Sequence, residues 1–226
     1  MKIPRINILL FLLFFSKSFL FSQNKESTKD LQTWHNLELK YKVLKKIDLA
    51  VEGGVRLIDN SKTVSKYFTD FSVTKKHNNL FSYSLGYRYL LNKNNDFLFE
   101  KKNRFYGDVR FKKKLYDRFL VNLRTRLQSQ IDTDFDGEQN IKNKLRKKIK
   151  LNYYFKQIDL DVFSALEVFY FFHSGFEKTR YMIGVQKSLA KKLDLGLNLM
   201  YQDELLDPLE SFFAFRTTVS YRIEVK

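Results

Sequence analysis

Residues 193–202, LDLGLNLMYQ, carry an apolar residue at every odd position and a polar, small or flexible residue at every even position. Successive side chains of a β-strand point to opposite faces, so this stretch predicts a strand with one apolar face and one polar face. The same period of two recurs down the chain, and no window shows a sustained period of 3.6. The sequence therefore predicts an all-β protein.

Eleven segments read as candidate strands. Each has about ten residues or more, which exceeds the five or six typical of soluble sheets and matches the nine to eleven of a tilted membrane strand. The expected strands cover residues 34–43, 47–57, 67–75, 80–90, 99–113, 117–129, 143–154, 157–169, 178–187, 192–203 and 211–225.

The N-terminus has the layout of a secretory signal peptide. Lys2 and Arg5 precede an apolar run over residues 6–15, and small and polar residues follow up to Gln23. The apolar run is shorter than the roughly 20 residues of a spanning helix. We expect a cleaved signal over residues 1–22 and a single β-barrel domain over residues 23–226.

Alternation alone fits either a membrane barrel or a soluble barrel or sandwich, because the pattern does not say which face points inward. Strand length, the signal peptide and aromatic residues at strand ends favour a transmembrane antiparallel up-and-down β-barrel, in which aromatic girdles mark the two interfaces. The expected girdle residues are Tyr41, Tyr89, Phe119, Tyr201 and Tyr221. A secreted basic β-protein that binds an anionic polymer is the alternative if the apolar faces point inward.

Short links are expected to alternate with wider polar loops, as in outer-membrane barrels with turns on one rim and loops on the other. Single-chain bacterial barrels usually have an even number of strands. The eleven candidates therefore predict a barrel of twelve strands, in which residues 23–33 supply a further strand. The alternative is ten strands, in which one of the eleven candidates is not a strand. The fold class is a barrel of about 10–12 strands.

The polar face holds charges of both signs that would line the lumen. A barrel of this size is narrower than a porin, so these charges either pair into a structural network that fills a scaffold or form a narrow, anion-preferring channel. The residues expected to line the lumen are Glu38, Glu52, Arg56, Asp70, Arg88, Arg104, Asp108, Arg110, Arg124, Arg126, Arg146, Glu167, Arg180, Arg216 and Arg222.

The net charge is +16, and loss of Lys2, Arg5 and Lys17 with the signal leaves +13. This charge favours anionic surfaces, and the export signal argues against nucleic acid as the partner. The chain has no cysteine, which excludes disulfides and thiolate chemistry.

Catalytic and metal-binding motifs are weak. His35, His77 and His173 lie apart in the sequence, and only His173 has a serine beside it. A Ser–His couple needs side chains that converge in space, so we expect no catalytic residue, although an outer-membrane lipid-modifying enzyme stays an alternative. The segment 132–138, DTDFDGE, departs from a calcium loop because no carboxylate follows at the required spacing. We expect no metal and no cofactor.

Several segments resemble a known family. The stretches QTW (32–34), GYRY (86–89) and RTRLQ (124–128), together with KLRKKIKLNYY (144–154), resemble the outer-membrane barrel proteins of the Bacteroidota collected as domain of unknown function 2490. The resemblance implies an outer-membrane location in a Gram-negative bacterium. It implies no activity and no catalytic residues.

Together these observations predict an outer-membrane barrel that acts as a structural scaffold or a narrow channel. Its expected partners are outer-membrane lipid and glycolipid, and the barrel-assembly machinery during insertion. The sequence leaves its oligomeric state open.

Overall fold

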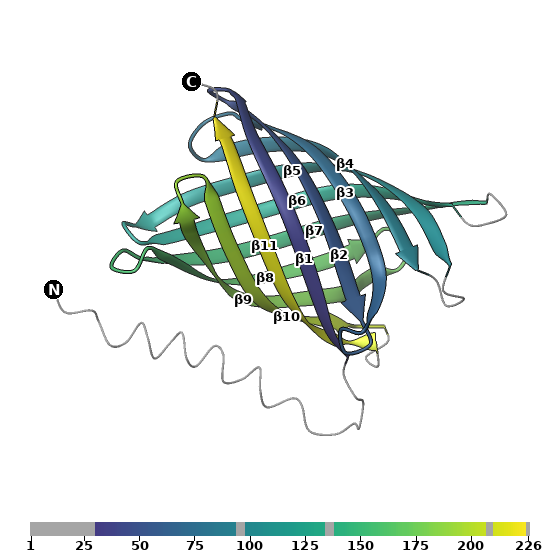
Figure 1. The fold of residues 1–226 in the computed structure, drawn as a ribbon. Helices are drawn as coiled ribbons and strands as arrows, with labels where there is room; N and C mark the ends of the chain where they lie inside the picture. Colours follow the sequence, from purple (N-terminus) through teal and green to yellow (C-terminus); the bar gives the residue numbers. More distant parts are fainter. Residues whose placement is uncertain (1–29, 94–97, 134–137, 207–209, 225–226) are drawn as a thin grey trace.

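The computed structural model describes residues 30–93, 98–133, 138–206 and 210–224, and its strands form one closed barrel (Figure 1). Within these residues, no helix has the length and apolar character needed to cross a membrane. The strands are β1 (Leu31–Leu44), β2 (Ile47–Ile58), β3 (Thr63–Lys76), β4 (Phe81–Lys93), β5 (Phe99–Tyr116), β6 (Phe119–Thr133), β7 (Gln139–Phe155), β8 (Leu160–Phe171), β9 (Gly175–Ala190), β10 (Leu193–Glu204) and β11 (Phe212–Glu224).

Consecutive strands pair antiparallel all around the ring, and β1 closes it by pairing in parallel with β11. Leu31 pairs with Phe213 at one end of this seam, and Lys42 pairs with Glu224 at the other. The expected preference for ten or twelve strands is therefore wrong. The described residues form eleven strands, and parallel closure satisfies the edge hydrogen bonds that an even count would satisfy with an antiparallel pair. Of residues 23–33, the first seven lie outside the described residues, and 31–33 belong to β1.

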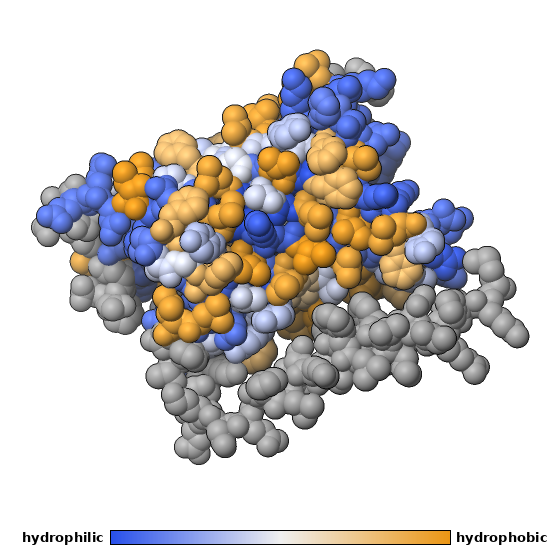
Figure 2. Space-filling view, turned by 180° about the vertical axis from the view of Figure 1, so that it is seen from behind, coloured by the Kyte–Doolittle hydropathy of each residue, from blue (hydrophilic) through white to orange (hydrophobic). Residues whose placement is uncertain are grey.

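The apolar face of every strand points outward. Leu85 is 73 % exposed and Leu37 is 68 % exposed, whereas Asp108 and Glu167 are each 2 % exposed on the inner face. A soluble barrel or sandwich has the opposite arrangement, so the soluble alternative is wrong. Hydrophobic residues cover much of the outer wall visible in Figure 2, and hydrophilic residues gather toward its ends.

Aromatic rings form two belts on the outer wall, as expected for girdles at membrane interfaces. Near one end Phe119 packs against Tyr153 with ring centroids 4.8 Å apart, and near the other end Tyr201 packs against Phe213 at 4.9 Å. The expected girdle residues divide between the two belts. Tyr41, Phe119 and Tyr221 lie toward the first end, and Tyr89 and Tyr201 lie toward the second.

The connections at the two ends of the barrel differ less in length than the sequence predicted. The turn rim carries the connections 45–46, 77–80, 117–118, 156–159 and 191–192, and the loop rim carries 59–62, 94–98, 134–138, 172–174 and 205–211. The expected strands left wide connections at residues 58–66 and 170–177. Both connections are shorter in the structure because β3 and β9 begin earlier than predicted. Strands of 12 to 18 residues exceed what a tilted membrane strand requires, so the barrel wall extends past the bilayer.

Candidate functional site in the barrel lumen

All fifteen charged residues expected on the polar face lie on the inner face of the barrel. On most strands each is separated by an even number of positions from a buried inward residue of its own strand. On β2 and β7, Glu52, Arg56 and Arg146 are instead register partners of the buried residues Asp70, Trp34 and Phe169. Ten are arginines and five are carboxylates. Taking this many charges out of water requires that most of them be paired and hydrogen-bonded.

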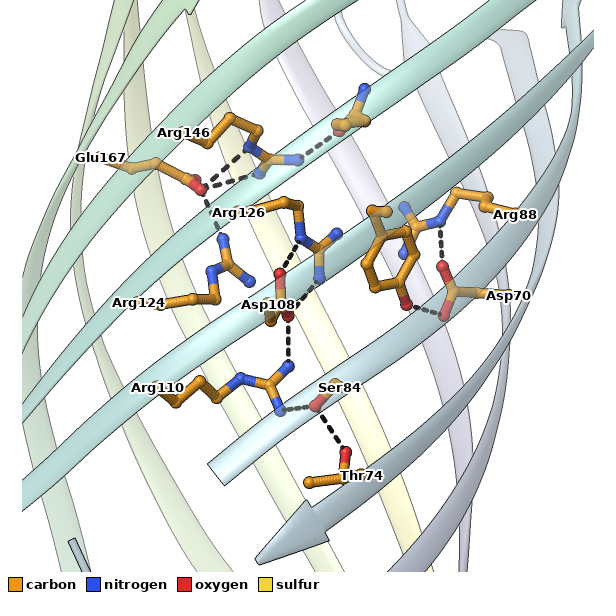
Figure 3. Close-up of polar contacts among 12 residues, drawn as sticks. Asp70, Thr74, Ser84, Arg88, Asp108, Arg110, Arg124, Arg126, Arg146 and Glu167 are labelled. Carbon is orange, nitrogen blue, oxygen red and sulfur yellow. Dashed lines mark hydrogen bonds and ion pairs between the residues drawn. The ribbon is translucent and has the colours of Figure 1, made fainter. Parts of the chain in front are cut away.

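Asp108 on β5 lies at the centre of the first ion-pair group (Figure 3). Arg126 on β6 donates from Nε to Oδ1 over 2.6 Å and from Nη2 to Oδ2 over 2.8 Å, and Arg110 donates to Oδ2 over 2.7 Å. The guanidinium of Arg126 also lies 3.6 Å from the centroid of the Tyr106 ring. A two-pronged pair stacked on an aromatic ring fixes both side chains in one geometry.

A second group continues from Tyr106 around the wall. The Tyr106 hydroxyl donates to Asp70 Oδ1 over 2.7 Å, and Arg88 Nε donates to Asp70 Oδ2 over 2.7 Å (Figure 3). Arg88 also reaches Glu52 at 3.2 Å, and Glu52 accepts from Arg216 of β11 at 3.2 Å. The contacts therefore link β6 to β11 through the intervening inner wall.

Glu167 on β8 is the centre of the third group. It accepts from Arg124, and from Arg146 over 3.1 Å at Nε and 2.8 Å at Nη2, and Arg180 Nη1 lies 4.0 Å away. Arg146 also donates to the amide oxygen of Gln128 over 3.3 Å. One carboxylate thus faces three guanidinium groups, which leaves local positive charge in excess.

Aromatic and apolar side chains fill part of the lumen beside these ion pairs. Trp34, the only tryptophan of the chain, is 4 % exposed and packs with Met182, Met200 and Ala214 in an apolar cluster inside the barrel. The guanidinium of Arg56 lies 3.8 Å from the Trp34 ring centroid, and that of Arg180 lies 5.4 Å away. Arg180 is on β9 and Trp34 is on β1, so this contact passes over the two strands between them, β10 and β11, on the inner wall.

Sequence reasoning missed several inward residues that complete this face. They include lysines such as Lys144, Lys148 and Lys150 on β7, the carboxylate of Asp194, and the rings of β8. The alternation of faces along β7 would have been enough to predict the inward lysines, since each lies an even number of positions from Arg146. The β8 rings were harder to find because the inner face of that strand also carries apolar side chains beside Glu167, so its alternation is weak.

The three histidines lie far apart. His35 is exposed on the outer wall, His77 lies at the turn rim against the Tyr83 ring, and His173 lies at the loop rim, 4.0 Å from Glu177. The Ser174 hydroxyl bonds Glu177. In the described ranges, no histidine is within hydrogen-bond distance of a serine hydroxyl.

The acidic segment 132–138 has its four central residues outside the described residues. Asp132 points into the lumen, where it pairs with Lys142 at 3.3 Å and Lys102 at 3.6 Å. No cluster of three or more potential metal ligands occurs among the residues that the structure describes.

Two solved structures are similar to this chain. One is described as a NanC porin, with a TM-score of 0.57 and 11 % identity over 87 % of this chain and 100 % of that chain. The other is the β domain of the Bordetella autotransporter BrkA, with a TM-score of 0.48 and 9 % identity over 77 % of this chain and 82 % of that chain. At such identities the likeness to the porin shows the fold alone, that of a closed β-barrel.

No curated protein matches the chain. The profile of one family matches residues 31–207, a range that contains β1 to β10, and its description is a protein of unknown function, DUF2490. The resemblance found in the short segments is thereby confirmed, and this chain belongs to the DUF2490 family.

Proposed function

We propose that this protein is exported through the signal peptide at residues 1–22, is inserted by the barrel-assembly machinery of a Gram-negative outer membrane, and forms a scaffold with a closed lumen there. Strand length, the apolar outer wall and the two aromatic belts support the membrane placement. Lipid and glycolipid are the surroundings that such a wall requires.

The contact between Arg180 and Trp34 carries the proposal of a closed lumen. It joins β9 to β1 over the two strands between them, Arg56 of β2 stacks on the same ring, and Trp34 is almost fully buried. The ion pairs centred on Asp108, Asp70 and Glu167 occupy the inner wall around it. Side chains fill the interior of an eight-stranded barrel, and the long arginine and aromatic side chains here support a blocked lumen in a barrel that is only moderately wider.

A narrow anion-preferring channel is the second candidate. The surplus of arginine favours it, because ten arginines face five carboxylates among the fifteen lumen residues and cationic linings select anions. On this alternative the Trp34 and Arg180 side chains would have to move apart for ions to pass.

Conductance of the folded protein in a planar bilayer distinguishes the two candidates. We expect no stable steps from the native protein, and steps from a Trp34→Ala, Arg180→Ala double variant. His35→Ala is the matched control, since His35 is the next residue of β1 and points to the outside. Stable, anion-selective steps from the native protein would reject the scaffold and support the channel.

A further inference from the structure

Between the apolar cluster and the turn rim, the lumen holds a cavity of about 190 Å³. Its wall comes from β1 and from β7 to β11, and it includes Lys148, Lys150, Phe163, Asn198, Arg216 and Thr218. The volume is several times the share of one water in the liquid, about 30 Å³, so a small solute with part of its hydration fits.

Lys148 and Lys150 face this cavity without a counter-ion. The nearest polar partner of Lys148 Nζ is the Met182 sulfur at 3.7 Å, and Lys150 Nζ lies 3.9 Å from the centroid of the Phe163 ring. Among the described residues neither ammonium group has a carboxylate within ion-pair distance. Half-buried ammonium groups without an opposite charge are unfavourable, so they attract an anion.

The carboxylates of the cavity wall are already engaged. Glu38 pairs with Lys40 at 2.8 Å and accepts from Ser220 at 2.7 Å. Asp194 pairs with Arg222 and accepts from Ser188 at 2.7 Å. Lys150 is near the carboxylate of Asp161 but outside ion-pair distance. Lys148 is near Glu167, which already faces three guanidinium groups. Neither lysine therefore has a direct ion pair in the wall.

Arg216 adds a donor to the same cavity. Its Nη2 donates to Glu52 over 3.2 Å, and 34 % of its side chain stays exposed, so part of the guanidinium is accessible from the lumen. The amide of Asn198, which is paired with Arg216 in the strand register, and the hydroxyl of Thr218 also line the cavity and can complete the shell of an oxyanion.

We propose that this cavity, with Lys148, Lys150 and Arg216 as its cationic groups, binds a small divalent oxyanion of the phosphate or sulfate type. Two lysines without a direct ion pair match two negative charges, and the neutral donors match the several oxygens of such an anion. The site does not require a conducting lumen, because its cavity extends from the middle of the barrel, at Lys148 and Asn198, toward the turn rim, at Lys150 and Asp194. Its test is therefore independent of the conductance test.

Calorimetric titration of the folded full chain in an uncharged sugar-headgroup detergent tests the site. The probes are inorganic phosphate, sulfate and acetate at one fixed ionic strength. We expect saturable binding of phosphate or sulfate that is at least tenfold tighter than binding of acetate. Absence of saturable binding, or equal binding of all three, would overturn the proposal.

Variants assign the binding to these residues. Lys148→Met with Lys150→Met should weaken phosphate or sulfate binding at least tenfold, whereas Lys147→Met, on the outward face of the same strand, should leave it unchanged. Asn198→Asp keeps both lysines and supplies a carboxylate beside Arg216, so it should also weaken binding at least tenfold. If the double lysine variant does not fold, unchanged affinity in Asn198→Asp rejects the site.

Discussion

Arg126 and Asp108 form a two-pronged ion pair inside the barrel, with donor–acceptor distances of 2.6 and 2.8 Å and with 6 % and 2 % of the two residues exposed. Neither group can recover its hydration if the other is lost. The pair thus makes the inner wall sensitive to the removal of single charges but less sensitive to the removal of both.

Asp108→Leu should lower the free energy of unfolding by about 3–5 kcal/mol, because Arg126 is left buried without its partner. The double variant Asp108→Leu, Arg126→Leu should lose less than the single variant, since no buried charge is orphaned. Denaturant titration followed by the fluorescence of Trp34 measures both. Equal losses in the single and double variants would show that the pair is not coupled.

Gly86→Ala should destabilise the barrel, because a Cβ on Gly86 would lie 2.2 Å from the Tyr106 ring. Displacing Tyr106 disturbs its hydrogen bond to Asp70, and overpacking of this kind costs about 1–3 kcal/mol. Gly53→Ala is the control, since its new methyl group would meet no atom within 4 Å. The same denaturant titration measures both variants. If Gly53→Ala lowered the free energy of unfolding as much as Gly86→Ala, the explanation would be contradicted.

Leu197→Arg places a charge at the middle of β10 on the outer wall, where insertion into a bilayer should cost about 2–4 kcal/mol. Leu205→Arg makes the same change just beyond the strand at the loop rim, where the cost should be about 0–1 kcal/mol. Folding yield in lipid vesicles, followed by the heat-dependent shift of the band on gels, reports the difference. Equal yields from the two variants would mean that this face does not contact lipid.

Leu37→Cys with Val219→Cys should form a disulfide on mild oxidation, because the two residues are direct partners across the parallel seam. The native chain has no cysteine, so the linkage is unambiguous. Leu37→Cys with Phe213→Cys is the mismatched control, six positions along β11, which at about 3.3 Å per residue is roughly 20 Å away. Mass spectrometry of the linked peptides identifies the product, and linkage in the control alone would reject the parallel register.

Most of the barrel could be predicted from the sequence because its signal is local. Alternation in a single strand, as in residues 193–202, indicates which side chains share a face, and the strand bounds follow from where alternation stops. Ring closure is not local: nothing in residues 31–44 alone indicates that β1 pairs in parallel with β11. For this reason the prediction of an even number of strands was wrong.

The lumen was predictable only in part. Parity places Asp108 and Arg126 on the same face, but which arginine a carboxylate bonds depends on the shear between neighbouring strands. Glu167 illustrates this, because it bonds Arg124 from β6, two strands away. The sequence places Trp34 only at the start of a strand. Its position inside the lumen depends on the pairing of β1 with β11.

The odd strand number has a consequence for biogenesis. Because β1 and β11 run in the same direction, Leu31 and Glu224 lie at opposite rims. The strands from β2 to β11 form five hairpins that each start and finish at the turn rim, and β1 is left without a hairpin partner. Hairpins can be delivered from one compartment with both of their ends remaining there. β1 cannot, so a barrel with this topology requires one strand end to cross the membrane during insertion, a step that an even-stranded barrel does not need.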